Sequence, residues 1–157
     1  MRDSTEKPSD TDAWKLVAAL NGLDEATVAK LKSLGTVKSF QEGTILFNES
    51  EQHAQLYFVC HGNFRLEMVT QACGMQTILS VGVGELLAWS ALIGDRSMTA
   101  TATAMQDSAA IVFDAASLKA ALDADVVLGY AVMQAVARAL SRRLLATRLQ
   151  LLDLYGR

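Results

Sequence analysis

The sequence predicts a mainly β fold, a double-stranded β-helix or jelly roll (β-roll), with short N-terminal helices and a long C-terminal dimerisation helix. The first observation behind this prediction is that the spacing of apolar residues changes from about 3.6 to about 2 near residue 36. The second is a series of short apolar runs up to residue 113, separated by turn residues. The third is the return of a helical spacing after Asp114.

The N-terminal region divides into a tail and two helices. Residues 1–11 are polar and contain the only proline, so we predict a flexible tail before a domain over residues 12–157. Each helix has a polar capping residue and a stop signal. The expected signals are, in chain order, a cap at Thr11 or Asp12, a stop at Asn21-Gly22, a cap at Asp24 and a stop at Gly35.

The predicted β-roll occupies about residues 36–114. Glycine and polar residues mark its turns, most clearly at residues 61–63. Apolar and polar residues then alternate from Phe64 to Met68, as on a strand with one side exposed to water. Residues 86–93 are apolar with small residues at their centre, which favours one helical turn there.

C-terminal helices are predicted over about residues 115–154. Asp114 is expected to cap a short helix through Leu122, and Asp123 or Asp125 a long one. On the long helix, residues at alternating steps of three and four form a seam that needs a partner, most simply a second copy of the chain. The alternative is that this helix packs back on its own roll. The predicted dimer-interface residues are Leu140, Leu144, Thr147, Leu151 and Leu154.

Composition limits the function classes. The chain has 157 residues, which fits one domain, and a formal net charge of −3. A domain whose main function is to bind nucleic acid is usually basic, so direct nucleic-acid binding is not expected. No uncharged apolar run of about 18 residues and no secretory signal occur, so we expect no membrane partner and a cytoplasmic location. Of the two cysteines, Cys60 is expected to be buried and Cys73 to lie in a loop.

Several segments carry a family resemblance. Residues 42–47 (EGTILF) and 56–66 (LYFVCHGNFRL) resemble the opening hairpins of cyclic-nucleotide-binding domains. Residues 84–92 (GELLAWSAL) resemble the phosphate-binding cassette of that family, and residues 96–102 (RSMTATA) the strand that leaves it. Residues 141–149 are similar to the dimerisation helix of Crp/Fnr-type regulators. The resemblance implies an effector domain with a β-roll, here as a single domain without the helix-turn-helix unit of those regulators.

A phosphate cradle can also be argued from the residues themselves. A short helix beginning near Ser90 would present free backbone N–H groups to an anion. Arg96 could pair with the same anion through two parallel hydrogen bonds, and Ser97 could add a hydroxyl group. The alternative is that Arg96 is a solvated hairpin residue beside Asp95.

The resemblance adds expectations for three residues. Thr147 matches the helix threonine that touches the purine in cyclic-AMP-responsive regulators, or else it is a small polar residue of the seam. Ala88 and Trp89 fall where the family has a glycine and the acid that binds the ribose 2′-hydroxyl. An indole N–H only donates, so Trp89 would fill part of the pocket or stack on a ligand. The predicted ligand-binding residues are Leu87, Ala88, Trp89, Ser90, Arg96, Ser97, Thr147 and Arg148.

The sequence therefore predicts a regulatory sensor that acts as a homodimer, with cyclic AMP or cyclic GMP as the candidate effector and no other cofactor or metal. No catalytic residues are predicted, since His53 and His61 lack a neighbouring acid–nucleophile pattern and further ligands at metal-binding spacing. One alternative is a ligand-free dimerisation or protein-interaction domain whose pocket is plugged by Trp89. Another is a haem or metal sensor that uses Cys60 and His61. The arginines of the long helix are interpreted as its solvated flanks: Arg138, Arg142, Arg143 and Arg148.

Overall fold

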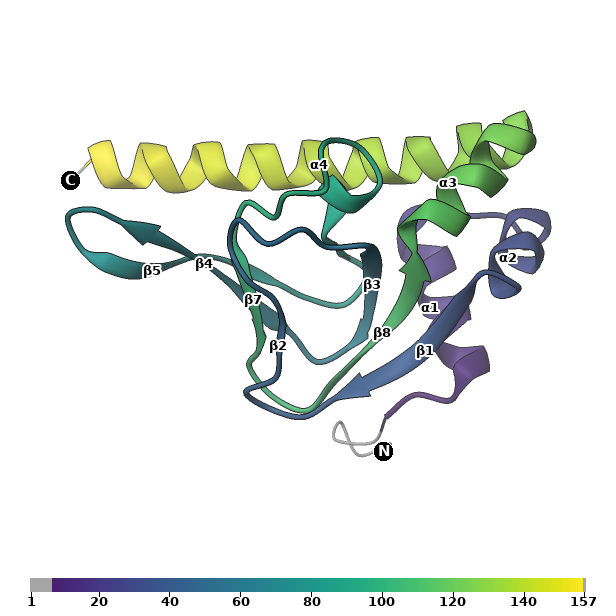
Figure 1. Cartoon of the computed structure of the whole chain (residues 1–157), viewed down its shortest axis with the longest axis horizontal. Coiled ribbons are helices and arrows are strands. Elements are labelled where there is room, and N and C mark those ends of the chain that lie inside the picture. The colour runs from purple at the N-terminus through teal and green to yellow at the C-terminus, as the bar shows by residue number, and fades with distance from the viewer. Residues whose placement is uncertain (1–6, 157) are drawn as a thin grey trace.

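Two four-stranded antiparallel sheets form a β-roll, which confirms the predicted fold class (Figure 1). This computed structural model describes residues 7–156. One sheet has the strand order β1-β8-β3-β6 and the other β2-β7-β4-β5. The strands are β1 (Gly35–Phe40), β2 (Ile45–Phe47), β3 (Gln55–His61), β4 (Phe64–Thr70), β5 (Gly74–Val81), β6 (Leu86–Leu87), β7 (Thr101–Ala104) and β8 (Ser108–Asp114).

Helices lie at both ends of the chain, and three of the predicted aspartate caps are confirmed. Asp24, Asp114 and Asp125 each accept a hydrogen bond from the backbone N–H three residues later, at 2.7, 2.8 and 3.1 Å. A 3-10 turn, η1 (Trp89–Ala91), interrupts the strands. The helices are α1 (Asp10–Asn21), α2 (Glu25–Lys32), α3 (Ala115–Ala124) and α4 (Val126–Tyr155).

Two predicted helix signals are wrong. Ser9 caps α1 in place of Thr11 or Asp12, because its hydroxyl oxygen accepts the Asp12 N–H at 3.2 Å. The helix therefore starts inside the predicted tail 1–11, of which residues 1–6 lie outside the described residues. Gly35 opens β1 and does not stop α2, which ends at Lys32. A side chain at Gly35 would lie 2.7 Å from the Phe113 ring, so this glycine serves strand packing.

The core has two layers, one on each face of the β1-β8-β3-β6 sheet. Along β8, Ala110 and Val112 face the interior of the roll, whereas Ile111 and Phe113 face the helices. The ring of Phe113 meets Trp14 of α1 edge to face, with 6.0 Å between the centroids. Because the sheet is covered on both sides, β3 and β8 are apolar without interruption between their terminal residues.

Gly62, in the β3–β4 turn, offers a matched stability test with Gly74. Both glycines have positive φ, 72° and 68°, which L-residues adopt at a cost of about 1 kcal/mol. A side chain at Gly62 would also overlap the Ser108 hydroxyl, whereas one at Gly74 meets nothing within 4 Å. We expect Gly62→Ala to lower the free energy of unfolding by about 3 kcal/mol and Gly74→Ala by about 1 kcal/mol in urea titrations. Equal losses would contradict the packing argument.

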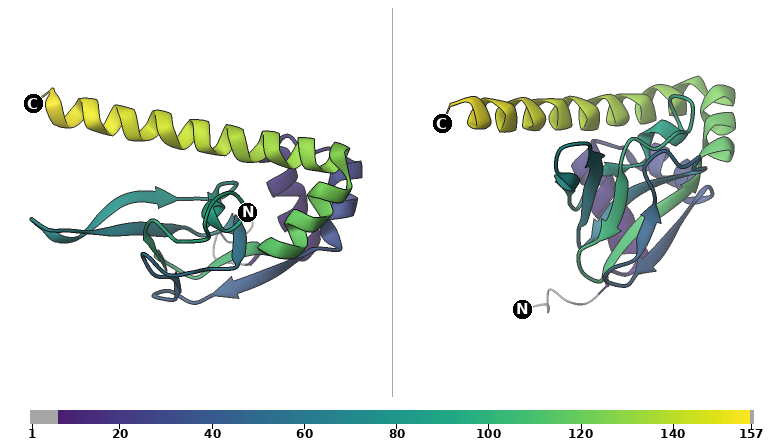
Figure 2. Two further views of the ribbon diagram at one scale, coloured as in Figure 1. Left: turned by 45° about the horizontal axis from the view of Figure 1, so that its top comes forward. Right: turned by 60° about the vertical axis from the view of Figure 1, so that its left-hand side comes forward.

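The long helix α4 runs along one side of the roll and extends past it. Its 30 residues span about 45 Å at 1.5 Å per residue. Its C-terminal half projects in the same direction as the β4–β5 hairpin, as two views agree (Figure 1, Figure 2). Within residues 7–156 we find no helix with the length and apolarity needed to cross a bilayer.

Candidate functional site

A backbone reversal after β6 shapes the candidate site. Leu87 of β6 pairs with Tyr57 of β3, and the next residue, Ala88, is left-handed at φ 61°. This conformation costs an alanine about 1–2 kcal/mol, so the surrounding packing must hold it. Ala88 directly precedes η1. Within the described part of the chain, the backbone N–H groups of Trp89 and Ser90 have no hydrogen-bond acceptor. We call residues 87–90 the cradle.

The cradle faces a very small cavity. The cavity volume is about 20 Å³, which is room for one water molecule. Pockets that hold drug-sized ligands are on the order of 300–1,000 Å³. The site is therefore too small for a nucleotide in this conformation. Its lining residues are Phe47, Leu66, Leu87, Ala88, Trp89, Ser90, Met98, Thr99, Ala100 and Arg143.

The charged group of this cavity comes from α4. The half-buried Arg143 side chain reaches the cradle, where its Nη2 donates a hydrogen bond to the Leu86 carbonyl oxygen. Its Nε is buried and has no hydrogen-bond partner among the described residues. Burial lowers the pKa of the Arg143 guanidinium, and the negative charge of Glu85 opposes that shift. Arg143 thus holds a positive charge in a poorly solvated place with one donor unused.

Arg143 is the one arginine of α4 for which the interpretation as a solvated flank is wrong. It follows the buried residues Val136 and Ala139 at steps of seven and four, so it lies on the face of α4 that packs against the roll. That spacing is visible in the sequence and could have identified it. By contrast, Arg142 and Arg148 are exposed.

Four of the eight predicted ligand-binding residues line the cavity, namely Leu87, Ala88, Trp89 and Ser90. The other four, Arg96, Ser97, Thr147 and Arg148, do not. Their ligand-binding role stays a prediction.

Arg96 is held outside the cradle by its backbone. Its residue is left-handed at φ 65°, its N–H donates to Ser90 O at 3.2 Å, and its C=O accepts from His53 N–H at 3.0 Å. The side chain is exposed. Hydrogen bonds from Ser117, and to a smaller extent the charge of Arg96, lower the pKa of Asp114. The exposed side chain outside the cavity lining agrees with the solvated alternative for Arg96.

On α4, Thr147 is exposed, and its hydroxyl donates to the Arg143 carbonyl oxygen at 2.9 Å within the same helix. Among the predicted seam residues, Leu140 packs partly against the core, while Leu144, Leu151 and Leu154 are exposed. A self-association surface on α4 stays a prediction.

Trp89 packs in two directions. Its half-buried side chain belongs to the apolar cluster between the sheet and the helices, and it also lines the cavity. The Trp89 side chain therefore contributes both to the cavity lining and to the apolar core between the sheet and the helices. The closure of the cavity is shared with Arg143 and the roll residues, so Trp89 alone does not plug it.

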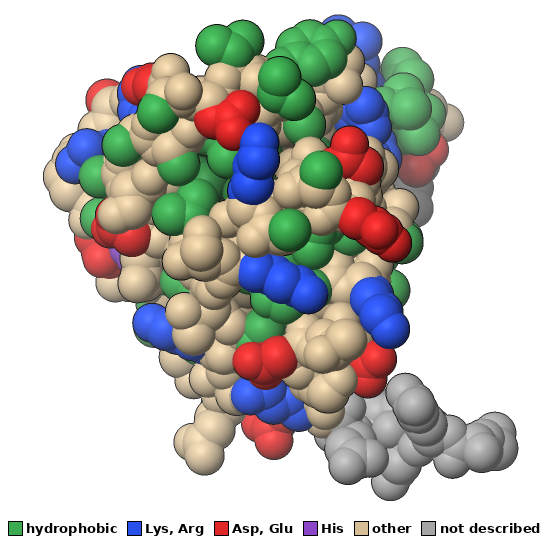
Figure 3. All heavy atoms as spheres, turned by 90° about the vertical axis from the view of Figure 1, so that its right-hand side faces the viewer, with side chains coloured by type: hydrophobic (Ala, Val, Ile, Leu, Met, Phe, Trp, Pro, Cys, Tyr) green, Lys and Arg blue, Asp and Glu red, His purple; other side chains and the backbone are tan. Residues whose placement is uncertain are grey.

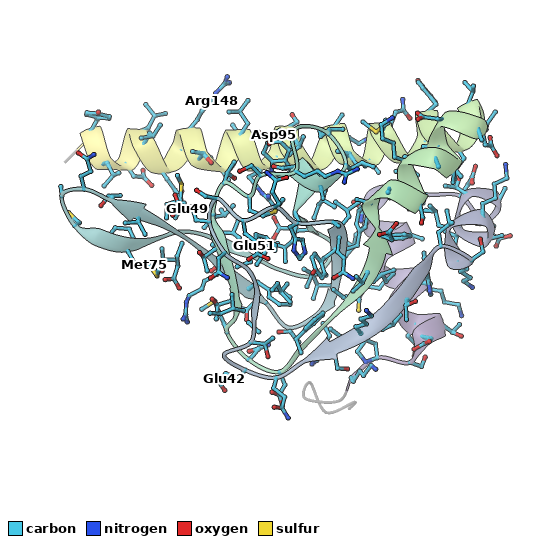
Figure 4. All side chains as sticks on the ribbon, in the orientation of Figure 1. Glu42, Glu49, Glu51, Met75, Asp95 and Arg148 are labelled. Carbon is cyan, nitrogen blue, oxygen red and sulfur yellow. The ribbon has the colours of Figure 1, made fainter. Side chains whose placement is uncertain are left out.

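A histidine–tyrosine pair lies beside the site. His53 Nε2 is 2.8 Å from the Tyr57 hydroxyl, and the His53 ring is 5.2 Å from the ring of Phe47. Burial lowers the pKa of His53, an effect that Glu51 in the same loop opposes (Figure 4). Burial also raises the pKa of Tyr57 to about 12. Both rings are therefore uncharged near neutral pH.

The lowered pKa of His53 predicts a pH effect on stability. The folded protein takes up this proton only below the ordinary histidine pKa of 6.5, so the unfolded chain binds more protons near that pH. The free energy of unfolding must then fall as the pH falls through 6.5. We expect His53→Gln to reduce this fall between about pH 7 and about pH 5 in urea titrations. An unchanged slope would contradict the assignment.

The two cysteines are expected to differ in reactivity. Cys60 is 2% exposed, and burial raises the pKa of its thiol to about 11. Cys73 is exposed in the β4–β5 turn. A thiol-disulfide reagent should therefore modify one thiol quickly in the native protein and a second only after denaturation. Retention of the fast phase in Cys73→Ser would contradict this prediction.

A larger groove elsewhere lacks the chemistry of the cradle. It has a volume of about 570 Å³ and lies between Leu92 and the α3–α4 junction, where Lys119 and Asp123 are already paired at 2.8 Å. Figure 3 looks onto the end of the molecule that carries α2, α3 and the start of α4, and basic and acidic side chains are intermixed there. Within the part of the chain that the structure describes, no group of three or more His, Cys, Asp or Glu residues could hold a metal.

A family model for the cyclic nucleotide-binding domain matches residues 37–125, from β1 to the cap of α4. The chain belongs to the cyclic nucleotide-binding domain family. The match includes the cradle, most of β1 and the whole of the other seven strands, so the resemblance to this family is confirmed. Arg143 lies on α4 beyond the matched segment.

Solved structures of the same fold support this assignment. The chain is similar to a cyclic nucleotide-binding domain from Methylobacillus flagellatus, with a TM-score of 0.83, 19% identity, and coverage of 92% of this chain and 84% of that one. It is similar to the N-terminal domain of a transcriptional regulator from Streptomyces coelicolor, with a TM-score of 0.67, 25% identity, and coverage of 87% and 94%. The catabolite activator protein of Thermus thermophilus gives a TM-score of 0.68 and 25% identity over 86% of this chain and 61% of that longer one. No curated protein matches the chain.

Proposed function

We propose that the chain is a cytoplasmic regulatory module that binds a small anionic effector between the cradle and Arg143, and that it acts as a homodimer through α4. A cyclic nucleotide is the first effector to test. Membership of the cyclic nucleotide-binding domain family supports a regulatory, ligand-binding role rather than catalysis. Two similar structures are those of a transcriptional regulator domain and a catabolite activator protein.

The observation that carries the proposal is the half-buried Arg143 guanidinium with an unused Nε donor at the cradle. A buried donor without a partner costs free energy, and a charged one costs more. An anion placed against Nε and the free N–H groups of Trp89 and Ser90 would satisfy all three. The rest of the cavity is lined mostly by apolar residues such as Phe47 and Met98, which suits the body of an organic ligand.

The proposal also gives a way for the effector to act. A cavity of about 20 Å³ must enlarge before a nucleotide can enter. Enlargement on the α4 side moves Arg143 away from the Leu86 carbonyl, and Arg143 belongs to α4. Ligand binding would therefore favour a different position of α4 relative to the roll, which changes the surface that α4 offers to its partner.

Isothermal calorimetry with cyclic AMP and cyclic GMP tests this function. We expect binding of at least one of them with a dissociation constant on the order of 10 µM, because the ligand-free site must first open. Absence of heat for both up to about 500 µM would contradict the nucleotide form of the proposal.

A second candidate function is a ligand-free dimerisation or protein-interaction domain, and the small cavity favours it. In that case the wild type would show no heat with either nucleotide. A variant with a new acceptor in the cradle, Trp89→Glu, would then bind a nucleotide that the wild type does not. Binding by the wild type itself would exclude this second candidate.

A further inference from the structure

The C-terminal half of α4 carries more exposed leucine than one dimer seam can cover. The predicted seam uses Leu144, Leu151 and Leu154. A second row at steps of four and three, Leu145, Leu149 and Leu152, is 58%, 54% and 67% exposed. At 3.6 residues per turn, the second row lies roughly 140° around the helix from the seam and roughly 120° from the residues packed on the roll. A partner helix seated on the seam therefore leaves the second row in water.

Unpaired arginines surround this second row. Arg142 and Arg148 lie on the same side of α4 as the row, and Arg148 points away from the roll in Figure 4. Arg142 and Arg148 form no ion pair or hydrogen bond with the described residues. Arg138 differs, because it donates to the Gln134 side chain at 3.3 Å and its guanidinium lies against Gly22 at the end of α1. We call the surface formed by Arg142, Leu145, Arg148, Leu149 and Leu152 the outer face of α4.

We propose that the outer face of α4 docks an acidic amphipathic helix of a partner protein. Three leucines at helical spacing fit the apolar face of a second helix. The arginines complement carboxylates on either side of that apolar face, and α4 offers a single acidic side chain of its own, Asp153. This surface is distinct from the effector site, because Arg143 lies on the face of α4 toward the roll.

Two other kinds of ligand fit the outer face less well. Nucleic acid would leave the three leucines unused, since phosphate neutralisation needs basic and polar groups. In a dimer with a twofold axis along the seam, the two outer faces would point in opposite directions, so a flat bilayer could contact only one of them. A partner helix can occupy each outer face separately.

Fluorescence anisotropy with designed peptides tests this proposal on the full chain. The probe is a labelled peptide of three LEELLEE heptads, and the comparison probes are an LKKLLKK peptide and a scrambled acidic peptide of equal composition. We expect the acidic amphipathic peptide to bind with a dissociation constant on the order of 10 µM, more weakly as salt rises. Neither comparison probe should bind within tenfold of that affinity.

Matched variants locate the binding surface. Arg142→Glu combined with Arg148→Glu should weaken peptide binding at least tenfold. Lys32→Glu combined with Lys38→Glu makes the same change in net charge at exposed positions of α2 and β1 and should change the affinity less than twofold. Leu149→Gln combined with Leu152→Gln should also weaken binding at least tenfold and leave the oligomeric state unchanged.

Several results would overturn the proposal. One is no binding of the acidic peptide up to about 200 µM, and another is equal binding of the scrambled peptide. Tighter binding of anionic vesicles or duplex DNA than of the peptide would assign the outer face to a different ligand. A change in oligomeric state in the Leu149 and Leu152 variant would assign the second row to the dimer. Because effector binding is read separately by calorimetry, failure here and failure of the proposed function can be told apart.

Discussion

Replacing Arg143 by glutamine is expected to weaken effector binding by about 1.5–3 kcal/mol, a factor of roughly 10 to 150. The substitution removes the positive charge that reaches the cradle from α4 and keeps a polar side chain for the Leu86 carbonyl. A hydrogen bond to a charged partner in a poorly solvated site contributes this much, because water cannot replace it there. Calorimetric titration of the wild type and the variant with the same nucleotide measures the difference.

The neighbouring arginine provides the control for this prediction. Arg142 has the same charge, lies one residue away on the same helix, and is exposed outside the cavity. Arg142→Gln should change the effector affinity less than twofold, since exposed charges are screened by salt. If both variants bind the effector equally weakly, the affinity depends only on the net charge of α4, and Arg143 makes no specific contact with the effector. Thermal unfolding of both variants would show whether the fold is kept.

The roll was predictable because local signals and packing agree. The turn at Gly62 and the aspartate caps at Asp24, Asp114 and Asp125 are set by backbone chemistry that a few residues specify. The period-two apolar pattern of β4 follows from a sheet with a core on one side, and the continuous apolar runs of β3 and β8 follow from a core on both sides. Each of these features depends on neighbours in the chain, so the sequence contains the information directly.

The cradle was only half predictable, because its charged group comes from a distant element. Leu87 to Ser90 form one local turn, and the prediction placed them together. The arginine that meets them, Arg143, lies more than fifty residues later, and only the packing of α4 on the roll brings it there. Arg96 is close in sequence, but its left-handed backbone directs its side chain outward. The spacing of residues along the chain does not predict a left-handed backbone conformation at a non-glycine residue such as Arg96.

The predicted dimer gives the second large effect. Leu144→Glu combined with Leu151→Glu is expected to convert a dimer at about 10 µM into a monomer in light scattering after gel filtration. Both leucines are about half exposed in the single chain, at 53% and 49%, so little of the fold depends on them. Burial of a leucine contributes about 1.5 kcal/mol or more, and a twofold seam buries four of them. The loss is then at least about 6 kcal/mol, or roughly 10⁴-fold in the dissociation constant, before charge repulsion is added.

The outer row of α4 supplies the matched control for the seam. Leu149→Glu combined with Leu152→Glu makes the same chemical change on the same helix, at residues that are 54% and 67% exposed. If the seam is the contact, this variant stays a dimer, because its new carboxylates remain in water. A monomer from the outer variant and a dimer from the seam variant would place the contact on the other side of α4. A monomeric wild type would contradict the predicted dimer, and α4 would then act as a single exposed helix whose leucine rows are both open to partners.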